Sequence, residues 1–121
     1  MKIKVSEADG AVLDWLVAKC KGKELYFFAD DPFKKDPWLV VNNTTDQPLH
    51  SFNPSTDWSF GGPIIEREGI GLDYYPDSGL WHAGTCEGTV WGMGRTPHIA
   101  AMRCYVISKL GDEVEIPEEL K

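Results

Sequence analysis

The chain has 121 residues, of which 42% are hydrophobic and 26% charged, and it carries a formal net charge of −7. This length and composition predict one folded domain, residues 1–121, and argue against an intrinsically disordered chain. The negative charge disfavours binding to duplex nucleic acid, because the twelve basic residues form no continuous basic block.

The cysteines and the apolar segments indicate the cellular compartment. Cys20, Cys86 and Cys104 are odd in number and widely spaced, which fits neither a disulfide framework nor a paired-cysteine zinc site. The N-terminus runs into a helical pattern rather than an apolar signal segment, and no stretch of about 18 apolar residues occurs. We therefore expect a cytoplasmic protein that needs no metal or other cofactor.

The first third of the chain predicts one helix followed by two strands. Ser6 and Glu7 are typical of a helix start, apolar residues then recur along one helix face, and Gly22 is typical of a helix end. Residues 25–28 and 38–41 are short runs rich in aromatic and β-branched side chains, which favour strands.

The middle of the chain predicts a long loop followed by short strands. Residues 42–62 are rich in Asn, Thr, Pro, Ser and Gly, and long loops in compact domains are usually functional or mobile. Further strands are expected at residues 64–65, 80–81 and 89–91, each bounded by Gly, Pro or Asp.

The strongest local signals surround the last helix. Thr96 can cap it, Pro97 suits its first turn, and Gly111 can end it. The acidic tail, residues 112–121, contains Pro117 and is expected to be a loose end. Together these elements predict an α+β fold, in which an N-terminal and a C-terminal helix pack on one face of a small, largely antiparallel sheet.

Arg103 is the first candidate for a functional residue. On a helical wheel it projects from the middle of an apolar face formed by Ile99, Met102, Val106, Ile107 and Leu110. Burying a guanidinium without a partner would cost several kcal/mol, so Arg103 should meet either an anionic ligand or a carboxylate. The internal alternatives are an ion pair with Asp57, Glu66 or Glu68, or a side chain that reaches water.

The second candidate is the segment that surrounds two adjacent glycines. Gly61 and Gly62 would let backbone N–H groups approach an anion, and Asp57 could hold a turn beside them. A plain turn before a strand is the alternative, because the phosphate-loop glycine spacing is missing. Nearby Trp58 could stack on a planar ligand, whereas Trp81 and Trp91 are expected to pack in the core.

The sequence assigns no catalytic residues and no metal ligands. Glu66 and Glu68 would point to opposite faces of a strand, which argues against a carboxylate pair acting together. His50, His82 and His98 show no metal-ligand spacing, and a pairing of His82 with Cys86 would be accidental. An enzyme is therefore the less favoured class.

Three segments carry a family resemblance. They read LDWLVAK at residues 13–19, STDW and GGPIIEREGI at 55–58 and 61–70, and TPHIAAMRCY and SKLGDEV at 96–105 and 108–114. Together they resemble the NinX family of small proteins encoded in temperate phage genomes, a family described mainly as a domain of unknown function. The resemblance implies a phage origin and a bacterial host cytoplasm, and it transfers no catalytic residues.

The function predicted from these features is capture of a small anionic, nucleotide-like ligand, which by analogy of phage context could be a host immune signal. Arg103 would neutralise its charge, Gly61 and Gly62 would donate backbone N–H groups, and Trp58 would stack, with Asp57 and Glu66 orienting these groups. A homo-oligomer could place such a pocket between subunits.

Two other classes of function remain open. A protein-interaction factor would present an apolar patch that holds Trp38, Phe52 or Phe60. A nucleotide-acting enzyme would place a carboxylate or a histidine of perturbed pKa close to Arg103.

Overall fold

The computed structural model describes residues 1–21, 25–28, 38–41, 50–51 and 54–116. Along this part of the chain, groups of three strands separate three helices of at least eleven residues each. In chain order the elements are β1 (Lys2–Lys4), η1 (Val5–Glu7), α1 (Gly10–Cys20), β2 (Leu25–Phe28), β3 (Trp38–Val41), β4 (His50–Ser51), α2 (Trp58–Glu68), β5 (Gly71–Tyr75), β6 (Leu80–Gly84), β7 (Trp91–Gly94), α3 (Pro97–Leu110) and β8 (Glu113–Glu115).

All strand pairs of the described chain are antiparallel, and the strands form three sheets with the orders β1-β8, β2-β3-β4 and β5-β6-β7. The predicted α+β class with antiparallel strands is therefore confirmed. The strands are divided among three sheets rather than gathered in one. The β1-β8 pair joins the two ends of the described chain, where Ile3 lies opposite Val114.

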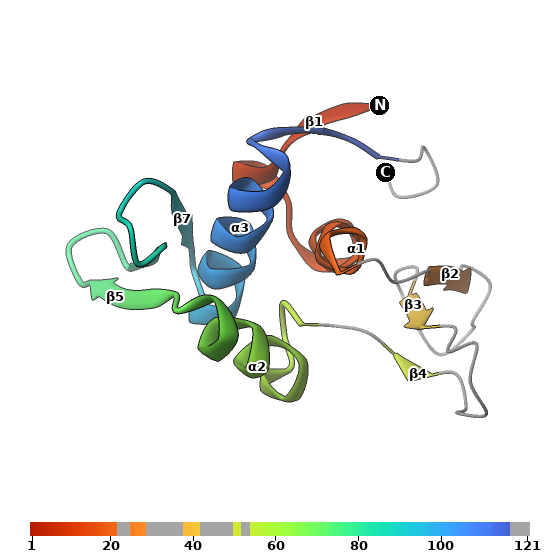
Figure 1. Cartoon of the computed structure of the whole chain (residues 1–121), viewed down its shortest axis with the longest axis horizontal. Coiled ribbons are helices and arrows are strands. Elements are labelled where there is room, and N and C mark those ends of the chain that lie inside the picture. Colours follow the sequence, from red (N-terminus) through yellow and green to blue (C-terminus); the bar gives the residue numbers. More distant parts are fainter. Residues whose placement is uncertain (22–24, 29–37, 42–49, 52–53, 117–121) are drawn as a thin grey trace.

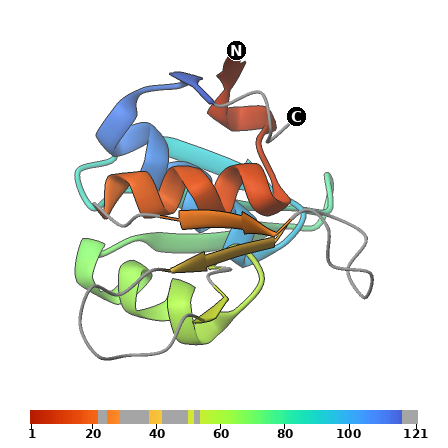
Figure 2. The ribbon, with the colours of Figure 1, turned by 90° about the vertical axis from the view of Figure 1, so that its right-hand side faces the viewer.

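The elements form layers around α3, which lies at the centre of the molecule (Figure 1). The β5-β6-β7 sheet packs on one side of α3, α1 packs on another, and α2 also contacts α3. The β2-β3-β4 sheet lies beyond α1, which contacts β3 (Figure 2). Both long terminal helices thus help to build one continuous core.

That core is formed mainly by apolar side chains of the helices. The fully buried large side chains include Leu13 and Leu16 of α1, Ile64 of α2, and Met102 and Val106 of α3. Burying each such side chain stabilises the fold by roughly 1.5–3 kcal/mol. The expected apolar face of the last helix is confirmed at Ile99, Met102 and Val106, whereas Leu110 is exposed.

The boundaries of the last helix match the local signals. The Thr96 hydroxyl accepts a hydrogen bond from the Ile99 N–H, Pro97 is the first residue of α3, and Gly111 follows its end with a φ of +84°. The tail prediction is wrong for its first part, because Glu113–Glu115 forms β8, a pairing with β1 for which the sequence offers no local signal. Residues 117–121 lie outside the described chain.

The first helix begins later than predicted. Ser6 and Glu7 belong to the short helix η1, and α1 begins at Gly10 after Asp9, with Lys21 following its end. The Gly22 prediction falls outside the described residues. The strands predicted at 25–28, 38–41 and 80–81 are present, and the one predicted at 89–91 begins at Trp91.

The largest error concerns α2. Residues 58–62 were predicted as loop and 64–65 as strand, but all belong to this helix. Asp57 caps it by accepting a hydrogen bond from the Ser59 N–H, and Gly69 ends it in the left-handed conformation at a φ of +65°. Burial of Ile64 and Gly61 on one face stabilises a helix that a glycine pair and Pro63 would not form alone.

Two glycines of β7 allow this strand to lie directly against α3. A Cβ on Gly92 would stand 2.5 Å from the carbonyl oxygen of Ala100, and one on Gly94 would stand 2.6 Å from Cγ2 of Ile99. Only glycine fits such distances. The close approach brings the backbone of Met93, between the two glycines, within reach of side chains on α3.

No helix in the described ranges is both long enough and apolar enough to cross a membrane.

Candidate functional site

Arg103 lies half-buried in the middle of α3 and joins three elements. Its Nε donates to the carbonyl oxygen of Ala8 at 2.7 Å, and its Nη1 donates to the carbonyl oxygen of Met93, also at 2.7 Å. The guanidinium therefore connects α3 to the N-terminal segment before α1 and to the edge strand β7. Among the described residues these are its hydrogen-bond acceptors, which leaves some of its five N–H groups for a further partner.

The charge of Arg103 is balanced only in part. Burial lowers the pKa of Arg103 below its usual value; the nearby Asp9 carboxylate opposes this shift and the Arg95 guanidinium adds to it. Within the described chain no carboxylate lies within 4.0 Å of Arg103, and the predicted pairing with Asp57, Glu66 or Glu68 does not occur there. Carbonyl oxygens satisfy hydrogen bonds, but they do not cancel a full charge.

Arg95 lies just before α3 and is the second cation at this site. Its Nη2 stands 3.5 Å from the Asp9 carboxylate, and both side chains are exposed, so this ion pair is weak. The two arginines and Asp9 leave a local excess of positive charge on a chain whose net charge is −7.

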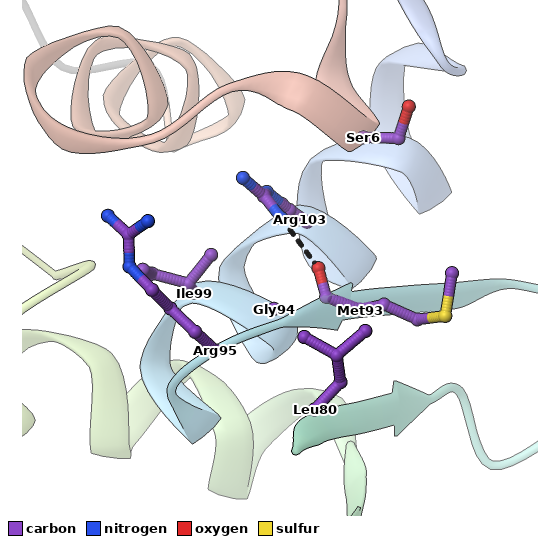
Figure 3. Close-up of a pocket in the computed structure, with 7 residues that line it drawn as sticks. All are labelled: Ser6, Leu80, Met93, Gly94, Arg95, Ile99 and Arg103. Carbon is purple, nitrogen blue, oxygen red and sulfur yellow. Dashed lines mark hydrogen bonds between the residues drawn. The ribbon is translucent and has the colours of Figure 1, made fainter. Parts of the chain in front are cut away.

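The arginines border a cavity of about 440 Å³ between β7, the start of β6 and the N-terminal segment. Figure 3 shows both guanidinium groups on the same side of β7, with Ser6 across the opening and Leu80 and Met93 on the sheet side. The residues that line the cavity are Ser6, Leu80, Met93, Gly94, Arg95, Ile99 and Arg103. This volume lies within the range of roughly 300–1,000 Å³ typical of small-molecule sites.

Asp57 and Trp58 lie elsewhere, at the start of α2. Asp57 Oδ1 accepts hydrogen bonds from the N–H and the hydroxyl of Ser59, at 2.9 and 2.7 Å, and these bonds lower the pKa of Asp57. The Trp58 ring is half-exposed, and its centroid lies 3.9 Å from that of the His98 ring. These two consecutive residues lie beside His98, and neither borders the arginine cavity.

His98 completes this second cluster, and it was not assigned a role from the sequence. Burial lowers the pKa of His98, while the Asp57 carboxylate acts in the opposite direction. Its Nε2 atom is buried and has no hydrogen-bond partner among the described residues. Because His98 is the second residue of α3, the cluster connects the starts of α2 and α3.

Gly61, Gly62 and Glu66 have positions that differ from the predicted anion-binding turn. The Gly61 N–H donates to the Asp57 carbonyl within α2, and a Cβ at Gly61 would stand 2.7 Å from the Pro54 carbonyl oxygen. Gly61 therefore serves close packing of the helix, and its N–H is already used. Gly62 is half-buried in the same helix, and Glu66 is exposed on it.

A buried carboxylate that the sequence analysis did not single out lies on α1. Asp14 is 6% exposed, and its Oδ1 accepts a hydrogen bond of 2.8 Å from the Ser55 N–H. Burial raises the pKa of Asp14 to about 6, and the Ser55 N–H acts in the opposite direction. The bond holds the segment before α2 against α1, so Asp14 has a positioning role.

The expected aromatic core is only partly present. Trp81 is half-buried, whereas Trp91 is 56% exposed, so the core prediction for Trp91 is wrong. Trp38 and Phe52, predicted for an interaction patch, fall among residues whose side chains are not described, and Phe60 is half-buried. No group of three or more potential ligands among the described His, Cys, Asp and Glu residues could hold a metal ion.

Arg95, Ser6 and Met93 are the site residues that sequence reasoning missed. Met93 contributes a backbone carbonyl, which leaves no signal in a sequence, and Ser6 was interpreted as a helix start. Arg95 directly precedes the Thr96 cap, so its place at the start of α3 beside the Arg103 face could have been found from the helix boundary alone.

Fold and site together define an α+β protein of helices and small antiparallel sheets with an arginine-lined cavity. A family model described as "Bacteriophage P22, NinX" matches residues 4–109, which is most of the chain and includes both arginines. The chain therefore belongs to the NinX family, which confirms the predicted resemblance and fits a phage protein. No curated protein matches the chain at a significant level.

Proposed function

We propose that the chain binds a small anionic ligand, of the nucleotide class, in the cavity between Arg95 and Arg103. The observation that carries this proposal is the pair of guanidinium groups that border one cavity on a strongly acidic chain. The N-terminus of α3, at the Arg95 end of the cavity, adds a partial positive charge.

The chemistry of the cavity wall supports a ligand with both a charged and a less polar part. Arg103 is held in place by two carbonyl oxygens, so its free N–H groups are preorganised for phosphate or carboxylate oxygens. Leu80 and Ile99 supply apolar surface beside them. Trp58, Gly61 and Gly62 do not border the cavity, so they do not belong to the proposed binding site.

The cavity favours binding over catalysis. A general acid or base must lie within hydrogen-bond reach of the reacting group. The described residues that line the cavity include no carboxylate and no histidine. In a phage protein, such binding would serve a counter-defence role in which the protein holds a host nucleotide signal and lowers its free concentration.

A thermal-shift screen tests this proposal with inorganic phosphate, AMP, cyclic di-GMP and ADP-ribose. A ligand at about 100 times its Kd should add about 2.7 kcal/mol to the free energy of unfolding. For a domain of this size the Tm should rise by several degrees. Arg95→Gln should remove most of the rise, and Arg67→Gln, which removes the same charge from α2, should leave it intact.

The fate of the ligand distinguishes a binding protein from an enzyme that acts on the ligand. Recovery of the unchanged molecule by mass spectrometry after incubation supports sequestration, and recovery of a product shows an enzyme. A panel without any shift, or a shift that Arg67→Gln reduces as much as Arg95→Gln does, contradicts the proposed site.

A further inference from the structure

The β5-β6-β7 sheet has an outer face that lies mostly outside the arginine cavity, and Leu80 and Met93 border both. One face of the sheet is turned to α3, since Cβ atoms on Gly92 and Gly94 would meet that helix. Paired residues of antiparallel strands share a face, and faces alternate along each strand. The register therefore places on the opposite face the side chains of Asp73, Tyr75, Leu80, His82, Trp91 and Met93.

This outer face is aromatic and accessible. Tyr75, Trp91 and Met93 are 47%, 56% and 51% exposed. Large side chains that gather on one exposed face are typical of an interaction site rather than of ordinary surface. Aromatic residues and methionine are also enriched in protein interfaces.

The rings on this face are held in place by neighbours. The Tyr75 ring stacks on that of His82, with centroids 3.8 Å apart and planes inclined by 21°. The Trp91 ring lies over Gly84, where a Cβ would stand 2.9 Å from a ring carbon. Such packing lowers the entropy that binding would cost and makes the face a preformed surface.

The charge on this part of the chain indicates the kind of partner. Residues 71–94, which form the sheet and its two turns, contain no lysine and no arginine but three acidic residues, Asp73, Asp77 and Glu87. None of the three forms an ion pair with another described residue. Negative potential beside exposed ring faces attracts cations and repels nucleic acid.

We propose that the outer face of β5-β6-β7 docks a basic segment of a partner protein. Lysine or arginine side chains of that segment lie over the Trp91 and Tyr75 rings and beside Asp73, and apolar side chains contact Met93 and Leu80. A second copy of this chain fits less well, because residues 71–94 contain no lysine or arginine that could pair with the carboxylates of another copy.

A peptide titration followed by NMR tests this docking surface. The probes are three ten-residue peptides in which valine alternates with arginine, with glutamate or with glutamine. The arginine peptide should shift the indole N–H signal of Trp91, assigned with Trp91→Phe, and the glutamate peptide should not. Raising the salt concentration should weaken the interaction.

Matched variants distinguish the two faces of the sheet. Trp91→Ser should weaken binding of the arginine peptide at least about tenfold. Tyr74→Ser changes a neighbour of Tyr75 that is equally exposed but points to the other face, so it should leave the affinity unchanged. The double variant Asp73→Asn/Glu87→Gln keeps the rings and should weaken binding by about threefold to tenfold.

Three results would overturn the docking proposal. One is equal binding of the arginine and glutamate peptides, or no binding of any of the three peptides. Another is an effect of Tyr74→Ser as large as that of Trp91→Ser. The third is a wild-type dimer in sedimentation velocity that Trp91→Ser dissociates, because the face would then be an interface between copies.

Discussion

At the scale of single residues, Arg103 has both a structural role and a place in the proposed binding site. It donates to carbonyl oxygens of Ala8 and Met93, which belong to segments 85 positions apart, and it borders the cavity between them. Its helix position and its half-buried state followed from the spacing of apolar residues. Its actual partners could not be predicted, because backbone carbonyls are present at every position of a sequence.

Arg103→Lys tests the structural part of this role. Lysine keeps the positive charge but cannot donate to both carbonyls with one planar group. We expect the free energy of unfolding to fall by about 1–3 kcal/mol, measured by urea denaturation. Arg67→Lys, on the exposed face of α2, should change it by less than about 0.5 kcal/mol. Equal stabilities of the Arg103→Lys variant and the wild type would contradict the connecting role.

Asp14 provides a prediction of pH dependence. Burial raises the folded pKa from 3.8 to about 6, so the folded protein binds the proton more tightly than the unfolded chain does. This group therefore makes the protein most stable below about pH 4, and its contribution declines as the pH rises to about 6. The change amounts to about 3 kcal/mol.

Asp14→Asn keeps the oxygen that accepts the Ser55 N–H but removes the titration. Subtracting the stability of the variant from that of the wild type at each pH also removes the opposite contributions of Asp57 and Glu68, whose pKa values are lowered by hydrogen bonds. The difference should decline between pH 4 and 6 in chemical denaturation. A difference that stays constant over this range would show that Asp14 does not titrate there.

At the scale of elements, the sequence predicted correctly the helix whose boundaries depend on residues close to it in the chain. α3 was found with both its boundaries because Thr96, Pro97 and Gly111 act within one turn of it. α2 was missed because Gly61, Gly62 and Pro63 disfavour a helix by propensity, and contacts with distant residues override that preference. The β1-β8 pair was missed because strands from the two ends of the chain meet only in the folded protein.

The contact between β7 and α3 depends on the two glycines of β7. Gly92→Ala would place a methyl group 2.5 Å from the Ala100 carbonyl oxygen, and backbone cannot move aside as a flexible side chain can. We expect a loss of about 1–3 kcal/mol or more in urea unfolding. Gly71→Ala, where the nearest atom is 4.0 Å away, is the matched control and should cost little. A similar loss for both variants would contradict the close-packing explanation.

At the scale of the whole molecule, charge is distributed unevenly over two surfaces. The positive cavity lies at the free edge of β7, and the acidic aromatic face covers the outside of the same sheet. The sequence showed the net charge of −7 and the α+β class, but the separation of the two surfaces depends on register and packing. The proposed anion site keeps Arg103 and pairs it with Arg95 in place of Gly61 and Gly62, because these two glycines lie inside α2.

The central claim is that an anion binds between these two arginines, and isothermal titration calorimetry tests it most directly. The molecule that gives the largest thermal shift is titrated into the wild type, Arg95→Gln and Arg67→Gln. We predict a Kd at least about tenfold higher for Arg95→Gln, since a charged hydrogen bond is worth about 1.5–3 kcal/mol. Arg67→Gln should bind like the wild type. Equal affinities of the wild type and Arg95→Gln would contradict the proposed site.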